Sequence, residues 1–159
     1  MLDDIDLQIL ALLQDNARIS QADIARQVGL VPSAVLERLR KLESRGAVRE
    51  YVAVLDPRAI DQRLLAFVAV KTTDRPGEQR AADALAAIPE VLEAHHVAGE
   101  DCLLLKIRAR DPEHLSQILR ERLGRVPGVN STRTTIVLET IKETPRLPLV
   151  APARDEVIG

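Results

Sequence analysis

The chain has 159 residues, enough for one ordinary domain or two small ones, and its core must be aliphatic because aromatic residues make up only 1%. A net charge of −2 argues against a protein that coats nucleic acid indiscriminately, although a local basic patch still permits specific DNA binding. One cysteine excludes an intramolecular disulfide, and no apolar run suits a membrane span or a signal peptide, so we expect a cytoplasmic protein with no membrane partner.

The N-terminal third of the chain begins with two predicted helices. Apolar residues recur at helical spacing after Asp3 and Asp4, either of which can begin the first helix. Ser20 can cap the second helix, because its hydroxyl accepts a hydrogen bond from a free amide of the first turn, and Asp23 completes a capping-box pattern. Gly29 then gives the backbone the freedom to leave this helix in a tight turn.

A third predicted helix follows the turn and has one apolar side. Pro32 fits its first turn, and Val35, Leu39 and Leu42 form its apolar stripe. Between residues 31 and 49 there are five basic and two acidic residues, so this stretch has a net charge of +3. The second and third helices have the layout of a helix-turn-helix, whose last helix can enter the major groove of double-stranded DNA.

Polar side chains on the other faces of this third helix are candidates for DNA contact. Arginine can bind guanine through two hydrogen bonds, and glutamate can accept one from cytosine N4. The positions predicted to face base edges are Ser33, Ala34, Glu37 and Arg38. The positions predicted to lie near phosphates are Arg40, Lys41, Arg45 and Arg49. The alternative is a solvated helix face with pairs at i,i+4 spacing, such as Glu37 with Lys41.

Residues 48–55 alternate between apolar and polar character and favour β structure, which predicts a short hairpin or wing. Asp56 and Pro57 end this run. We therefore expect a winged helix-turn-helix DNA-binding domain over residues 1–60, followed by a short connection.

Residues 61–142 predict a second domain in the order strand, helix, strand, strand, helix, strand. The expected strands cover residues 64–71, 91–97, 102–108 and 129–138. The expected helices are residues 78–88 and a second helix capped by Asp111. The segments IPEV at 88–91 and VPGV at 126–129 each mark a helix end followed by a strand start, so the domain has two similar halves. Such halves form a ferredoxin-like βαββαβ domain, with a four-stranded antiparallel sheet and both helices on one face. The fold class is therefore α+β.

The predicted sheet has apolar residues on both faces, although the helices can cover only one. Residues 65–70 and 103–105 do not alternate cleanly. A second copy of the chain would cover the free face and give a two-fold dimer. The alternative cover is the tail at 143–159, whose three prolines predict an extended and partly disordered segment.

Four segments carry a resemblance to a known family: DLQIL at 6–10, DIARQVGL at 23–30, RLRKLESRG at 38–46 and VAGED at 97–101. In this order and spacing the chain resembles the Lrp/AsnC, or feast/famine, family of prokaryotic transcription regulators, from residue 3 to about residue 149. The resemblance implies a winged helix-turn-helix and a ligand-responsive sheet domain. It also implies dimers that assemble into tetramers or octamers, with an amino-acid effector bound between dimers near the glycine-containing turn.

The resemblance makes that turn the expected effector loop, in which backbone amides bind a carboxylate and an acidic side chain binds an ammonium. The last strand carries two threonines on one face, which could supply hydroxyls. The residues expected to bind the effector are Gly99, Glu100, Asp101, Cys102, Thr132 and Thr134. The alternatives are a plain hairpin turn and ordinary strand threonines.

Two positions depart from the family pattern. Val31 stands before Pro32 where the family commonly has Ser, and a valine cannot accept the capping hydrogen bond. Cys102 stands where many members have Asp, so it lacks a carboxylate that could pair with an amino group.

No motif in the sequence calls for an enzyme. His95 and His96 are adjacent on a strand and so point to opposite faces, and no second cysteine stands at ligand spacing. We therefore expect no catalytic residue, no metal site and no cofactor. The predicted function is sequence-specific transcription regulation in response to a small metabolite, with an amino acid as the favoured effector. The alternative is a metabolite-sensing module whose N-terminal unit docks a protein partner.

Overall fold

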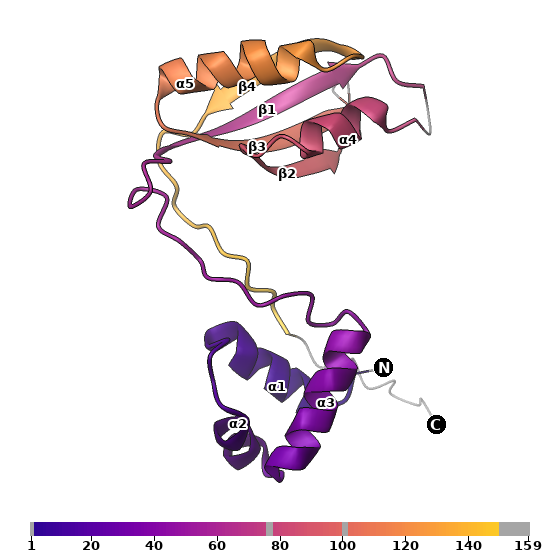
Figure 1. The fold of residues 1–159 in the computed structure, drawn as a ribbon, viewed down its shortest axis with the longest axis vertical. Coiled ribbons are helices and arrows are strands. Elements are labelled where there is room, and N and C mark those ends of the chain that lie inside the picture. The colour runs from indigo at the N-terminus through magenta and orange to yellow at the C-terminus, as the bar shows by residue number, and fades with distance from the viewer. Residues whose placement is uncertain (1, 76–77, 100–101, 150–159) are drawn as a thin grey trace, which may run out of the picture. The chain divides into compact units, whose positions relative to one another are not determined.

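The computed structural model describes residues 2–75, 78–99 and 102–149. Its contacts divide the chain into two compact units (Figure 1). The first unit contains the residues up to Val54 and also the segment that begins at Glu143, and the second unit is Leu55–Lys142. The division falls after Val54 rather than after Ile60, and residues 56–62 close a turn through hydrogen bonds among themselves.

The first unit contains three helices, α1 (Asp4–Asp15), α2 (Gln21–Val28) and α3 (Pro32–Ser44), as predicted. A complete capping box begins α1, because Asp3 and Asp6 each accept a hydrogen bond from the other's backbone amide. Ser20 caps α2 as predicted and accepts from the amide of Asp23 at 3.0 Å. The reciprocal half of that box differs from the prediction, because the Asp23 carboxylate accepts from the Ser20 hydroxyl instead of the backbone.

The core of the first unit consists of aliphatic side chains from all three helices. Ile9 of α1 and Ile24 of α2 pack against the α3 stripe of Val35, Leu39 and Leu42. All five side chains are buried, as the helical periodicity predicts for the stripe. This packing fixes the face that α3 turns to solvent.

The hairpin predicted over residues 48–55 is not formed in the described chain, where this stretch is extended and belongs to no strand ladder. Tyr51, Val52, Val54 and Leu55 are exposed. A hairpin needs a return strand beside the first, whereas the chain continues from here into the second unit. The β-propensity of this stretch therefore indicates an extended backbone, but it does not show whether another strand lies beside it to pair with.

The segment 143–149 is extended and lies against α1 of the first unit. The Gln14 carboxamide forms two hydrogen bonds with the backbone of Leu147, which it donates to at 3.0 Å and accepts from at 2.7 Å. Arg146 forms an ion pair with Asp15 at 2.9 Å. A groove of about 650 Å³ lies between α1, this segment and residues 47–54. The described part of the tail therefore belongs to the helical unit and is not the cover for the sheet.

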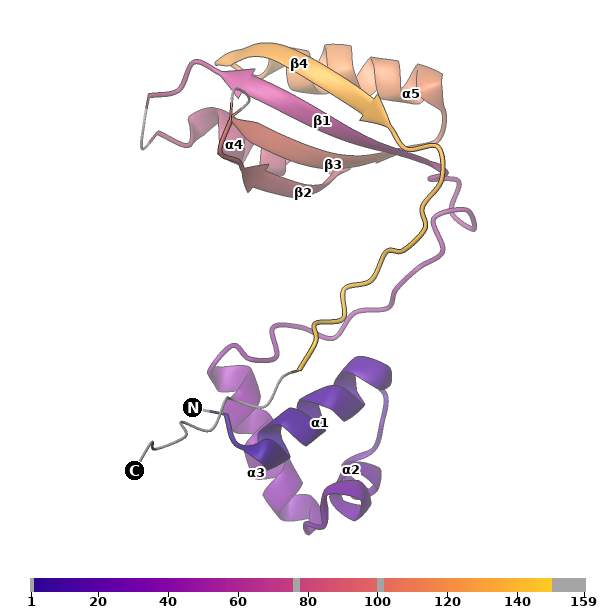
Figure 2. The same cartoon turned by 180° about the vertical axis from the view of Figure 1, so that it is seen from behind.

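The second unit is the predicted βαββαβ domain. Its strands are β1 (Leu64–Thr72), β2 (Val91–His96), β3 (Leu103–Ala109) and β4 (Val129–Ile136), paired antiparallel in the order β2-β3-β1-β4. Its helices are α4 (Arg80–Ala86) and α5 (Pro112–Gln117), and α5 continues as a π-helical turn, η1 (Ile118–Arg122), and a 3₁₀ turn, η2 (Leu123–Arg125). Both helices lie on one face of the sheet, as Figure 1 and the opposite view in Figure 2 show.

The two faces of the sheet differ more than the sequence predicts. Along β3, Leu103, Leu105, Ile107 and Ala109 are buried against the helices. The open face has a half-buried apolar centre at Phe67, Ala69 and Leu104, but it also carries charge. Lys106 of β3 forms an ion pair with Glu93 of β2 at 2.9 Å. The prediction of two apolar faces is therefore correct only for the centre of the open face.

We expect Gln14→Ala to loosen the tail from α1, because Leu147 then loses both of its hydrogen-bond partners. The measurement is the rate at which trypsin cuts after Arg146, which should rise. The cost in unfolding free energy should be at most about 1 kcal/mol, because water can replace these exposed bonds. Gln8→Ala, at an exposed site of the same helix, is the control, and equal cleavage rates in the two variants would contradict the docking.

Candidate nucleic-acid interface and effector loop

The solvent-facing side of α3 carries most of the residues predicted to contact DNA. Ala34 is half-buried, and the exposed residues of the set are Ser33, Glu37, Arg40, Lys41, Arg45 and, just beyond the helix, Arg49. The helix begins at Pro32 after Val31, which makes no side-chain cap, as expected. The α3 helix therefore presents polar and basic groups on its solvent side, while its opposite side is buried in the core.

Arg38 differs from the other basic residues of α3 because it bonds within the unit. Its Nη1 lies 2.7 Å from Asp3 Oδ2 and 2.7 Å from Asp6 Oδ1. The Arg38 side chain is 29% exposed and that of Asp6 is 12% exposed. The guanidinium thus joins the middle of α3 to the start of α1. Its predicted contact with a base edge stays a prediction, and the observed geometry gives it a positioning role.

The charges of this cluster reinforce one another. The pKa of the Asp3 carboxyl is lowered, first by the hydrogen bond from the Asp6 amide and then by the Arg38 guanidinium. The pKa of Arg38 is raised by its hydrogen bonds to Asp3 and Asp6. Both partners therefore hold their charges over the whole neutral range.

Glu37 and Lys41 form the i,i+4 pair that the alternative reading of this helix face anticipated. Their charged atoms are 2.6 Å apart, and Lys41 lowers the pKa of Glu37. Both side chains are well exposed, and water screens such surface pairs, so they contribute little to stability. Lys41 can therefore exchange this partner for a phosphate at small cost. Arg40, Arg45 and Arg49 form no ion pair with any residue in the described ranges.

The predicted effector loop is described only in part, because Glu100 and Asp101 lie outside the described residues. Gly99 has φ +146°, a backbone conformation that favours glycine. The Cys102 amide donates to Val70 O at 3.1 Å, and the Cys102 carbonyl accepts from Val97 at 3.1 Å. The Cys102 backbone is therefore engaged in joining the strands, and its half-buried side chain packs against the core of the second unit.

The two threonines of β4 lie at the same end of the sheet as this loop. Thr132 pairs with Val70 of β1 and Thr134 pairs with Val68, so both face the helix side. Cys102 bonds Val70 from the β3 side, so it and Thr132 flank one residue of β1. They are about two strand spacings, roughly 10 Å, apart. The threonines and the loop can thus lie along one ligand only if it spans that width.

The Asp3–Asp6 pair is the feature of this region that sequence reasoning missed. The D-x-x-D spacing at the start of a helix is a capping-box signal, and it was available in the sequence. The ion pair to Arg38 had no comparable local signal. His95 and His96 pair with Leu104 and Leu103, so they face opposite sides of the sheet as predicted.

Two other features are absent from the described ranges, a metal-binding cluster and a membrane-spanning helix. These residues contain no group of three His, Cys, Asp or Glu side chains that could hold a metal ion. None of the helices in this part of the chain is long and apolar enough to cross a membrane.

Two family models match the chain. The model described as winged helix-turn-helix DNA-binding matches residues 2–49. The model described as Lrp/AsnC ligand binding domain matches residues 65–147. The first match lies within the helical unit, and the second covers most of the sheet unit and continues into the first residues of the tail.

Similar proteins cover nearly the whole chain. The HTH-type transcriptional regulator FL11 of Pyrococcus horikoshii is 37% identical over 148 residues, 93% of this chain and 97% of that one. The leucine-responsive regulatory protein of Escherichia coli K12 is 40% identical over 149 residues, 92% of this chain and 90% of that one. A solved structure, the feast or famine regulatory protein of M. tuberculosis complexed with L-methionine, is 35% identical with a TM-score of 0.86 and covers 94% of this chain and 100% of that one.

We expect Arg38→Ala to lower the free energy of unfolding by about 1–3 kcal/mol, because it leaves the mostly buried Asp6 carboxylate without its ionic partner. Chemical unfolding of the full chain, followed by helical circular dichroism, measures this loss. Arg40→Ala is the matched control on the same helix and should change stability by no more than about 0.5 kcal/mol. Equal losses in the two variants would contradict the positioning role of Arg38.

The lowered pKa of Asp3 predicts a pH dependence of stability. Because the folded state holds this proton less tightly than the unfolded chain, whose carboxyl has the usual value of 3.8, the contribution is complete above that value. It is lost as the pH falls through the lowered pKa of the folded state. Urea midpoints measured from neutral pH into this acid range should therefore fall more steeply for the native sequence than for Asp3→Asn, which keeps a capping oxygen but cannot ionise. Parallel curves would refute this assignment.

Proposed function

Because the chain belongs to the Lrp/AsnC family and is a DNA-binding transcription regulator of that type, we propose that it recognises a specific DNA sequence and responds to an amino acid. The relatives that it resembles are named as regulators. The observation that carries the proposal is the α3 helix, which has a buried apolar stripe and an exposed basic side.

In the proposed complex α3 lies in the major groove. Ser33, Ala34 and Glu37 of its first half face base edges, and Arg38 sets the angle of the helix from within the unit. The basic residues of its second half and beyond contact phosphates: Arg40, Lys41, Arg45 and Arg49. Phosphate contacts fix the position of the protein, whereas base contacts select the sequence.

We propose that two chains pair through the open faces of their sheets and that such dimers assemble into tetramers or octamers. The half-buried centre at Phe67, Ala69 and Leu104 supports this, because a second copy would remove it from water. The ion pair of Glu93 and Lys106 beside that centre would restrict the relative orientation of the two sheets. A two-fold dimer would then place its two α3 helices about one turn of DNA, or a multiple of one turn, apart. The proposed location of this complex is the cytoplasm.

The proposed effector is an amino acid that binds near the loop at Gly99. One relative is named for its response to leucine and one solved neighbour for its L-methionine complex, which supports this class of ligand. Thr132 and Thr134 are the proposed hydroxyl donors, and the Cys102 side chain, Glu100 and Asp101 complete the proposed site. The effector can change DNA binding only if one assembly binds it better than another. Nothing in the comparisons supports the alternative of an N-terminal unit that docks a protein.

We expect Arg40→Ala to weaken binding to all DNA sequences alike, because it removes a phosphate contact. The slope of log affinity against log salt should become less steep by about 0.9. Footprinting and gel shifts on the protein's own promoter region, over a range of salt and with and without amino acids, provide the measurement. Arg120→Ala, an exposed arginine of the second unit, is the control and should keep the native slope. An absence of salt-sensitive, sequence-dependent binding under every condition would refute the proposed function.

A further inference from the structure

Val31 is an exposed apolar residue at the N-terminal end of α3. Its side chain is 62% exposed, and among residues 2–50, all of which the structure describes, no other large aliphatic side chain is exposed. Val31 is the N-cap residue, and it forms no side-chain hydrogen bond to the free amides of the first turn. Serine, threonine, aspartate and asparagine stabilise this position because they form that bond. Valine therefore leaves α3 without a side-chain cap and places an apolar group in water.

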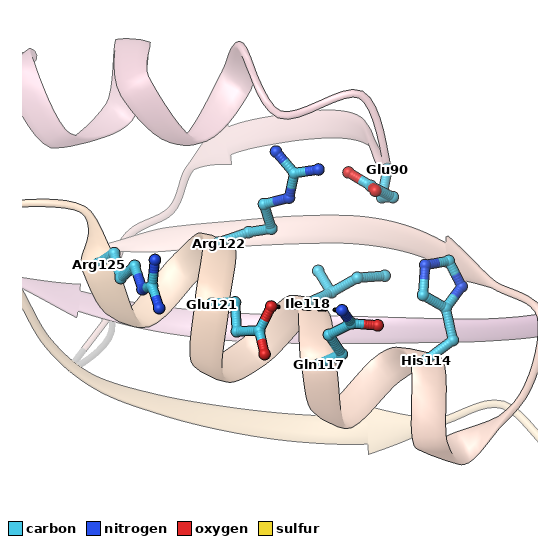
Figure 3. A pocket seen from close by; sticks show the side chains of 7 residues that line it. All are labelled: Glu90, His114, Gln117, Ile118, Glu121, Arg122 and Arg125. Atoms are coloured by element: carbon cyan, nitrogen blue, oxygen red, sulfur yellow. Dashed lines mark hydrogen bonds between the residues drawn. The ribbon is translucent and has the colours of Figure 1, made fainter.

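A helix surface of the second unit provides a comparison. Glu90, on the turn that precedes β2, faces α5, η1 and η2 across a groove of about 260 Å³ (Figure 3). The helix residues that line this groove are Ile118, which is 2% exposed, and the polar or charged residues His114, Gln117, Glu121, Arg122 and Arg125. On this surface the apolar side chain is buried and polar side chains meet the water. Val31 shows the opposite arrangement at the start of α3.

The neighbours of Val31 in the sequence carry no charge with which to bind a phosphate. Residues 32–34 form the first turn of α3, and none of them is ionisable. The first basic residue of the helix is Arg38, whose guanidinium is bonded to two carboxylates at the start of α1. The next one, Arg40, lies roughly 13 Å beyond Val31 along the helix axis. The N-terminal end of α3 is therefore uncharged and partly apolar.

An uncharged, partly apolar helix end matches one feature of the major groove. The N-terminal residues of a recognition helix contact base edges, so in the proposed complex Val31 lies next to them. The base edges present hydrogen-bond donors and acceptors, and the apolar group among them is the C5-methyl group of thymine. Contact between valine and this methyl group removes both from water, whereas contact with an amino or carbonyl group would leave that group without a partner.

We propose that Val31 is a specificity-determining residue, which contacts the methyl group of a thymine in each half of the two-fold DNA site. This inference rests on the proposed binding of α3 in the major groove, and it adds a base preference that the polar residues of the helix do not supply. Ser33 and Glu37 can bind base edges only through hydrogen bonds, whereas Val31 distinguishes thymine by shape and apolarity.

Replacement of single thymines by deoxyuridine tests the contact, because uracil pairs as thymine does and lacks only the methyl group. The DNA is the part of the protein's own promoter region that the full chain protects in footprinting. Gel shifts measure the affinity of the full chain for each substituted duplex. Replacing one particular thymine in each half of the site should weaken binding about fourfold, which corresponds to one methyl group removed from an apolar contact.

Val31→Ser should abolish this methyl effect, so that the variant binds the thymine and deoxyuridine duplexes equally well. Serine is the better N-cap, so thermal unfolding of the variant should occur at the native temperature or above it, which separates a lost contact from a damaged fold. Val52→Ser is the matched control, because Val52 is also 62% exposed and lies outside α3. This control should keep the methyl effect of the native chain.

Two results would overturn the Val31 contact and leave the proposed function intact. One is sequence-dependent binding in which no deoxyuridine substitution changes the affinity. The other is a methyl effect of the same size in Val31→Ser as in the native chain, which would assign the thymine to another residue. Binding that does not depend on sequence in any duplex would overturn the proposed function, and the contact with it.

Discussion

The first turn of α1 bonds the middle of α3, whose solvent-facing side is fixed by the aliphatic core. Asp3 and Asp6 cap the helix through each other's amides, and their remaining oxygens hold the guanidinium of Arg38. The same two carboxylates thus cap the start of α1 and bind the middle of α3. The aliphatic core restrains α3 about its long axis, and the two bonds of Arg38 add a polar restraint beside it.

Helix limits and strand order could be read from the sequence because their signals are local. Ser20, Gly29, Pro32 and Asp111 all act within a few residues of the position where they stand, and the structure places each at the helix end that they predict. The sheet order follows from the repeated β-α-β pattern in the same way. Local rules suffice wherever the partner of a residue is less than one helical turn or one hairpin away.

The remaining features depend on partners that are remote in sequence. The bond between Arg38 and Asp6 joins residues that are 32 apart, and that between Gln14 and Leu147 joins residues that are 133 apart. Without knowledge of such a partner, the sequence predicts only that a polar residue on a helix faces solvent. Residues 48–55 show the reverse case, because strand character in a sequence does not specify a strand to pair with. The groove at Glu90 likewise depends on a turn and a helix that only the fold brings together.

The return of the tail to α1 makes the second unit an insertion within the first. The chain leaves the helical unit after Val54 and returns to it at Glu143, so two backbone segments connect the units instead of one. Strain in β4 also has a covalent route to Arg146 and hence to Asp15 of α1 that does not pass through residues 55–63. The C-terminal end of β4 therefore gives the helical unit a second covalent connection to the inserted domain, in addition to the one through residues 55–63.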